Sequence, residues 1–205
     1  MSRALTVVDM QRDFCEGGAL AAADTLSLLE PLRRFIAIAR KAGVKIVFTQ
    51  DWHPANHSSF QSEGGPWPVH CVADSRGAEL MPPLAAEPGD VVIHKGVTVA
   101  GAGYSGFEST NLAERLSALG VQDVAVCGVA TEYCVRATAI DAANARLRVA
   151  VLTDLIRPVQ MAAVENALRE MSALGIETTE SKAWLDADVP SSGYQKSRPP
   201  QDAAG

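Results

Sequence analysis

The 205-residue sequence lacks the long apolar runs of a membrane protein, since none approaches the ~20 residues that span a bilayer. It also lacks a basic excess: 18 Lys and Arg stand against 24 Asp and Glu, for a net charge of -6. That charge argues against a nucleic-acid partner or an anionic membrane surface. No signal-peptide hydrophobic region follows the first residues, so we expect a cytoplasmic protein.

Cysteine is also scarce, and the spacing of the four cysteines matches no Cys-x-x-Cys zinc or redox motif. We expect them to be reduced, because disulfides are rare in the cytoplasm. The chain is long enough to bury a core without disulfides or metal. We predict one domain over residues 1–187, followed by a disordered or loosely packed tail over the Pro-, Ser- and Gly-rich residues 188–205.

Short apolar runs alternate with helical patterns along the chain. This alternation predicts an α/β fold, a three-layer sandwich with a mostly parallel six-stranded sheet and helices on both faces. Ser27 is a candidate N-cap of the first helix, which would place Pro31 in the first turn. The expected strands are 4–8, 44–50, 91–95, 121–126, 147–153 and 176–180, and the expected helices are 28–39, 112–119, 131–146 and 164–171.

Chemically useful side chains stand where predicted strands end. Asp9, Asp51, Lys95 and Cys134 each lie at or just after the end of a strand. In parallel α/β sheets, ligands bind beyond the carboxyl ends of the strands, near a switch in strand order. We therefore expect these four residues to share one cleft.

A carboxylate and three histidines gather in the long loop after the second strand. Asp51 and His53 share a side if the chain is extended there, and His57 and His70 follow. Nitrogen and oxygen ligands without thiolate suit one divalent metal ion, Zn²⁺, Fe²⁺ or Mn²⁺. The alternative is a polar surface loop with incidental histidines. His94 lies in a strand and faces away from Lys95, so we interpret it as structural.

Cys134 is a candidate nucleophile. Thr131 is a plausible N-cap, which places the thiol in a first helical turn where N–H groups and the helix dipole favour a thiolate. Lys95 nearby would lower the thiol pKa and favour an oxyanion, and Asp9 is a candidate base. The alternatives are a buried structural cysteine, a lysine that reaches solvent and a surface or capping aspartate. Tyr104 lines either a flat apolar pocket or the core.

Taken together, these motifs resemble the nicotinamidase/pyrazinamidase family of the isochorismatase-like cysteine hydrolases. The resemblance covers about residues 5–181. It is carried by Asp9-x-Gln-x-Asp-Phe14, Asp51-Trp-His53, His57, Trp67-Pro-Val-His-Cys71, Lys95-Gly, Tyr104-Ser-Gly-Phe107 and Gly128-Val-Ala-Thr-Glu-Tyr-Cys134.

The resemblance implies hydrolysis of nicotinamide to nicotinate and ammonia through a thioester, with pyrazinamide as a further substrate. Cys134 would be the nucleophile, Asp9 the base and later the acid, and Lys95 the partner of the thiolate. The backbone N–H groups of Ala130 and Cys134 would form the oxyanion hole, after a cis peptide bond between Val129 and Ala130.

The resemblance also implies the binding residues. Asp51, His53, His57 and His70 would hold the metal, which the pyridine nitrogen reaches, and the ring would be held by Phe14, Trp67 and Tyr104. Two alternatives stay open: an amidase for another small amide, and a non-catalytic protein that binds metal or nicotinamide. The sequence is also compatible with a homo-oligomer.

Overall fold

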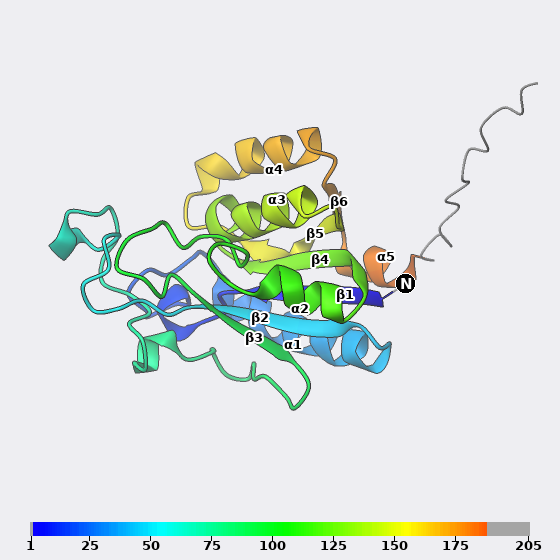
Figure 1. Cartoon of the computed structure of the whole chain (residues 1–205), viewed down its shortest axis with the longest axis horizontal. Helices are drawn as coiled ribbons and strands as arrows, with labels where there is room; N and C mark the ends of the chain where they lie inside the picture. The colour runs from blue at the N-terminus through cyan, green and yellow to red at the C-terminus, as the bar shows by residue number, and fades with distance from the viewer. Residues whose placement is uncertain (1, 188–205) are drawn as a thin grey trace, which may run out of the picture.

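The computed structural model describes residues 2–187, so the expected tail lies outside the described residues (Figure 1). No helix in this range is long and apolar enough to cross a membrane. The strands are β1 (Ser2–Val8), β2 (Lys45–Asp51), β3 (Val91–Lys95), β4 (Val121–Val129), β5 (Arg148–Arg157) and β6 (Glu177–Thr179). The α-helices are α1 (Thr25–Lys41), α2 (Leu112–Ala118), α3 (Arg136–Asn144), α4 (Val164–Ala173) and α5 (Ser181–Asp186).

The six strands form one sheet in the order β3-β2-β1-β4-β5-β6, and every neighbouring pair is parallel. The predicted α/β fold is confirmed, with a fully parallel sheet rather than a mostly parallel one. The strand order reverses between β1 and β4. Asp9 follows β1 and Ala130 follows β4, so both lie at the switch point where such sheets bind ligands.

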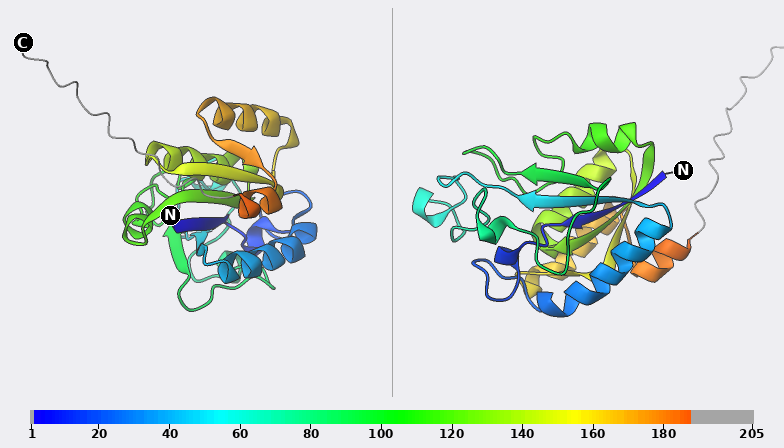
Figure 2. Two further views of the ribbon diagram at one scale, coloured as in Figure 1. Left: turned by 90° about the vertical axis from the view of Figure 1, so that its right-hand side faces the viewer. Right: turned by 90° about the horizontal axis from the view of Figure 1, so that it is seen from below.

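The sheet is buried between two helix layers, which confirms the predicted sandwich (Figure 2). Side chains alternate across each strand, so Leu5 and Val7 of β1 pack with α1 and α5, whereas Ala4 and Val8 pack with α2, α3 and α4. The strands β1 and β2 are accordingly buried on both faces, as expected for a covered parallel sheet, whereas the edge strands β3 and β6 are partly exposed.

The start of α1 differs from the expectation. The helix begins at Thr25, so Ser27 is not its N-cap, and Pro31 lies inside the helix rather than in its first turn. The Glu16 carboxylate, from the preceding loop, accepts hydrogen bonds from the Thr25 hydroxyl and the Leu26 N–H. A side chain nine residues upstream therefore satisfies the first turn, which no local capping pattern predicts.

The turn after β4 also differs. Thr131–Val135 form a π-helical turn preceded by Ala130, so Thr131 is not an N-cap and α3 begins only at Arg136. The Val135 N–H reaches back five residues to the Ala130 carbonyl at 3.1 Å. A capping pattern that assumes α-helical spacing does not describe such a turn. Other expectations also need correction: β4 runs on to Val129 and β5 to Arg157, and α5 was not anticipated.

Candidate active site

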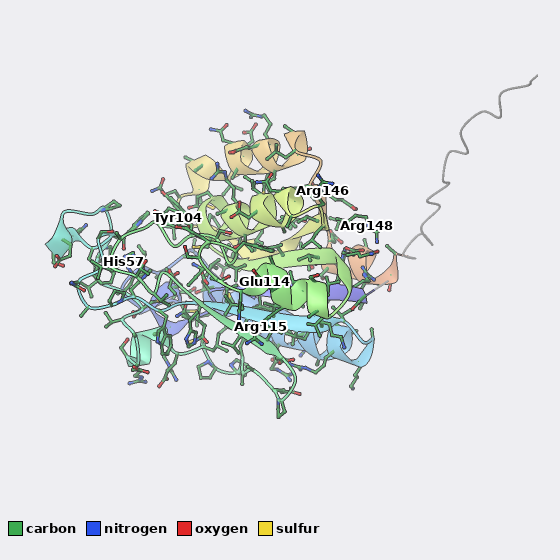
Figure 3. The ribbon with its side chains drawn as sticks, viewed as in Figure 1. His57, Tyr104, Glu114, Arg115, Arg146 and Arg148 are labelled. Carbon is green, nitrogen blue, oxygen red and sulfur yellow. The ribbon has the colours of Figure 1, made fainter. Side chains whose placement is uncertain are left out.

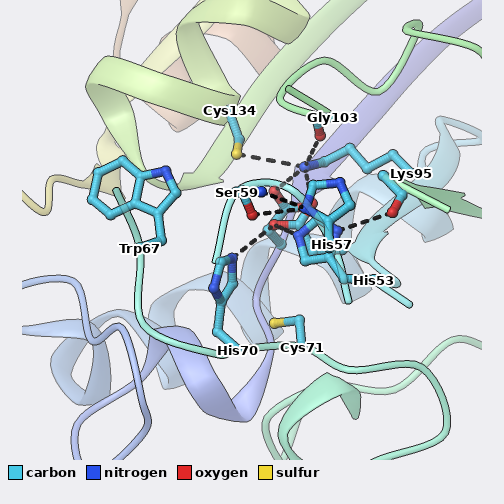
Figure 4. Close-up of polar contacts among 12 residues, drawn as sticks. His53, His57, Ser59, Trp67, His70, Cys71, Lys95, Gly103 and Cys134 are labelled. Atoms are coloured by element: carbon cyan, nitrogen blue, oxygen red, sulfur yellow. Dashed lines mark hydrogen bonds and ion pairs between the residues drawn. The ribbon is translucent and has the colours of Figure 1, made fainter. Parts of the chain in front are cut away.

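A buried lysine joins the ends of four parallel strands. Lys95 Nζ lies 2.8 Å from Asp9 Oδ2, pairs with Asp51 Oδ1 and lies 3.5 Å from Cys134 Sγ (Figure 4). It also donates to the Gly103 carbonyl at 2.9 Å. The structure thus brings together the four residues that were expected to share a cleft.

Lys95 does not reach solvent, because its side chain is fully buried. Burial lowers the pKa of a lysine, but Asp51 and Asp9 outweigh that effect and raise the pKa of Lys95 well above its usual value. The ammonium group therefore stays charged and places a fixed positive charge beside the thiol.

The pKa values of the two carboxyl groups that pair with Lys95 shift in opposite directions. Burial raises the pKa of Asp9 and outweighs the opposing effects of Lys95, which pairs with Oδ2, and of Thr49, which donates to Oδ1 at 2.7 Å. Burial also acts on Asp51, but Lys95 and His53 outweigh it and lower its pKa. Asp51 therefore stays ionised, whereas Asp9 is poised to take up a proton.

The thiol of Cys134 is within reach of that base. Ligand atoms of Asp9, Asp51 and Cys134 all lie within 4.8 Å of one another. Burial raises the pKa of Cys134 well above its usual value; Lys95 lowers it, as expected, without reversing the shift. Burial therefore favours the protonated thiol, and its proton has to leave as the sulfur reacts.

Asp51 also faces a cluster of imidazoles. Its Oδ2 lies 3.4 Å from His53 Nε2 and 3.9 Å from His70 Nε2, and the three ligand atoms lie within 4.8 Å of one another. His53 Nδ1 lies 2.9 Å from the Gly96 carbonyl and His70 Nδ1 lies 2.8 Å from the Pro68 carbonyl. A carbonyl only accepts, so each Nδ1 donates and leaves Nε2 as a ligand atom. This donor set fits a divalent metal ion.

His57, the fourth expected ligand, lies beside this triad. Its ring stacks on His53 with centroids 4.1 Å apart, and its Nδ1 lies 2.7 Å from Ser59 Oγ. Its Nε2 is buried and has no hydrogen-bond partner among the residues that the structure describes, as expected for an atom that ligates a metal ion. Burial lowers the pKa of both His57 and His70, which favours the neutral rings that bind metals. His94 stands apart, exposed and stacked on Trp52.

The Cys134 thiol and two of the possible metal ligands, Asp51 and His70, line one pocket. The pocket lies at the carboxyl end of the sheet, where His57 and Tyr104 lie, opposite the end with Arg146 and Arg148 (Figure 3). The three residues expected to hold a ring all line it. The lining comprises Phe14, Leu20, Asp51, Trp67, His70, Tyr104, Ala130, Tyr133, Cys134 and Val159.

The aromatic wall of the pocket is fixed by its own contacts. Trp67 Nε1 donates to the Tyr104 hydroxyl at 2.9 Å, and Tyr133 stands perpendicular to Trp67 with centroids 5.1 Å apart. Sequence reasoning missed Tyr133, although its place next to Cys134 was a usable signal. It also missed Leu20 and Val159, which carry no local signal.

Two acidic side chains that were not expected, one buried and one half-buried, support the site. Glu132 Oε1 accepts from the N–H groups of Val159 at 3.0 Å and Gln160 at 2.5 Å. Asp13 Oδ2 accepts from the Cys71 N–H at 2.7 Å and so holds the loop that carries His70. The Val129–Ala130 peptide bond is cis, as the resemblance implies.

Comparisons with known proteins agree with this geometry. The Isochorismatase domain family matches residues 3–183. Nicotinamidase of Escherichia coli (strain K12) is 37% identical over 205 residues, covering 89% of this chain and 96% of that protein. The structure is similar to Pyrococcus horikoshii pyrazinamidase in complex with zinc (TM-score 0.84, 43% identity, 88% and 99% of the two chains). It is also similar to PnC1 from L. infantum in complex with nicotinate (TM-score 0.83, 38% identity, 89% and 94%). The chain therefore belongs to the isochorismatase family.

Proposed function

We propose that the protein is a nicotinamidase, which hydrolyses nicotinamide to nicotinate and ammonia. One observation carries this proposal: a single pocket is lined both by the Cys134 thiol and by Asp51 and His70, two of the possible metal ligands. A flat ring with a carboxamide at one side and a nitrogen donor at the other can meet both at once. The relatives support it, because one is a nicotinamidase and another binds nicotinate.

The chemistry follows from the positions of three side chains. The Asp9 carboxylate takes the proton of Cys134, and the thiolate attacks the carboxamide carbon. Lys95 keeps its charge beside the sulfur, and the N–H groups of Ala130 and Cys134 stabilise the oxyanion. Asp9 then returns the proton to the departing ammonia, and water hydrolyses the thioester.

Asp51, His53, His57 and His70 would hold one divalent metal ion. When bound, the metal supplies a Lewis acid that orients the pyridine nitrogen. Because one structural neighbour contains zinc, we take Zn²⁺ as the first candidate; His and Asp ligands also suit Fe²⁺ and Mn²⁺. Phe14, Trp67 and Tyr104 would flank the ring, with Tyr133 completing the aromatic wall.

The test is ammonia release from nicotinamide by metal-loaded protein. Cys134→Ala should lower turnover by at least about 10³-fold, because the thioester can no longer form. Cys127→Ala is the matched control, because it truncates another buried cysteine, whose thiol donates a hydrogen bond to the Thr6 carbonyl inside the sheet. No turnover by the metal-loaded protein, or full turnover by Cys134→Ala, would refute the proposal.

A variant of a proposed metal ligand distinguishes a nicotinamidase from an amidase that hydrolyses small non-aromatic amides. If the pyridine nitrogen binds the metal, His57→Ala should weaken Zn²⁺ binding and raise KM for nicotinamide. A protein that prefers aliphatic amides and is indifferent to His57→Ala would belong to the alternative class.

A further inference from the structure

Gln11 is a buried side chain beside the site that the proposed chemistry does not use. It is fully buried, and its carboxamide makes three hydrogen bonds. The Asp51 N–H donates to Gln11 Oε1 at 2.8 Å, while Nε2 donates to the Asp51 carbonyl at 2.8 Å and the Ala78 carbonyl at 2.9 Å. Because an N–H only donates and a carbonyl only accepts, these partners fix which atom is oxygen and which is nitrogen.

These bonds replace a strand partner that β2 lacks at its end. β1 pairs with β2 as far as Val8, opposite Thr49, and Asp9 then turns the chain away with a φ of 47°. β2 continues to Asp51, whose backbone N–H and C=O on that side would otherwise be unpaired. The Gln11 carboxamide presents an acceptor and a donor side by side, as a peptide group does, and completes the ladder.

The position of Asp51 matters because its carboxylate has two sets of partners. Oδ1 pairs with Lys95, while Oδ2 faces His53 at 3.4 Å and His70. A small movement of its backbone would disturb both sets at once. We propose that Gln11 is a positioning residue that fixes the Asp51 backbone so that one carboxylate serves the metal and the lysine together. This inference rests on the proposed metal-binding role of Asp51.

The chain supplies a matched control for a test. Gln50 precedes Asp51, is also buried, and donates to the same Ala78 carbonyl at 2.9 Å. Gln11→Met and Gln50→Met both remove a bond to Ala78 with similar side-chain volume, but only Gln11→Met also releases Asp51. Gln11→Glu is a second variant that keeps the length and the acceptor for the Asp51 N–H while removing the donors.

The measurement is the Zn²⁺ dissociation constant of the full-length protein, by competition with a chromogenic chelator. Removing a residue that orients a metal ligand typically costs ~10–100-fold in metal affinity. We expect Gln11→Met and Gln11→Glu to weaken Zn²⁺ binding by about that factor, and Gln50→Met by less than about threefold. At saturating Zn²⁺, kcat should fall for both Gln11 variants, because Lys95 loses its partner geometry.

Equal Zn²⁺ affinities for the Gln11 and Gln50 variants would overturn the inference. If the variants do not fold, hydrogen exchange of the unaltered protein still tests the inference. The Gln11 carboxamide hydrogens should exchange with solvent far more slowly than those of exposed Gln122. Equally fast exchange would also overturn it. Since Zn²⁺ affinity requires no turnover, failure to hydrolyse nicotinamide would count against the proposed function alone.

Discussion

Replacing Lys95 by Met should destabilise the protein in a pH-dependent way. The side chain is fully buried and its Nζ lies 2.8 Å from Asp9 Oδ2 and pairs with Asp51. At that separation and an effective dielectric constant of about 20, Coulomb's law gives about 6 kcal/mol for one pair. The avoided cost of burying the ammonium offsets part of this, and breaking a buried pair typically costs about 3–5 kcal/mol. We expect a loss in that range at pH 8.

The sign of the pH dependence follows from the carboxylates left behind. Without Lys95, the folded-state pKa of Asp9, already raised by burial, rises further, and the pKa of Asp51 rises because only His53 is left to oppose burial. A raised carboxyl pKa means that the folded state binds the proton more tightly. Stability therefore falls as the pH rises through the folded-state pKa, and the deficit of the variant should be larger at pH 8 than at pH 5.

Urea unfolding at both pH values, with chelator present, measures this deficit. Lys182→Met is the control, since Lys182 pairs with Asp186 on an exposed helix surface and its loss should not be resolvable. A deficit for Lys95→Met below about 1 kcal/mol, or one that is the same at both pH values, would contradict the assignment of Lys95 as the counter-ion.

Three further outcomes are expected. Tyr104→Phe removes the acceptor of the Trp67 Nε1–H, so KM for nicotinamide should rise about fivefold in steady-state assays, equivalent to ~1 kcal/mol. Glu132→Ala releases the Val159 backbone from the pocket wall, and we expect KM to rise about tenfold with kcat within about threefold; an unchanged KM would exclude this role. Zn²⁺ should accelerate alkylation of Cys134 by iodoacetamide at pH 8, because added positive charge lowers the raised thiol pKa. An unchanged alkylation rate would argue against coupling between metal binding and the thiol pKa.

Periodicity and strand ends predict most of the fold and the membership of the site. Each buried strand is a short apolar run, and parallel pairing then collects Asp9, Asp51, Lys95 and Cys134 at one edge without any further information. The cluster in the long loop is likewise visible, because three of four histidines lie there.

Contacts between distant segments could not be predicted in this way. Glu16 satisfies the first turn of α1 from outside the helix, and Gln11 takes the place of a strand partner forty residues along the chain from Asp51. Neither residue differs locally from any surface Glu or Gln. The pKa of Cys134 was also misjudged, since a sequence shows a nearby cation but not the depth of burial that outweighs it.

The arrangement of charge explains why one residue, Asp51, belongs both to the group around the thiol and to the possible metal ligands. Lys95 is a single cation against Asp9 and Asp51, so these three buried groups carry an excess negative charge that opposes a thiolate. A divalent cation held by the second oxygen of Asp51 would reverse that balance within a few ångströms of the sulfur. Binding the metal and forming the nucleophile are then coupled through one carboxylate. The coupling depends on the direction in which Asp51 points, and the role proposed for Gln11 is to hold the backbone from which that carboxylate projects.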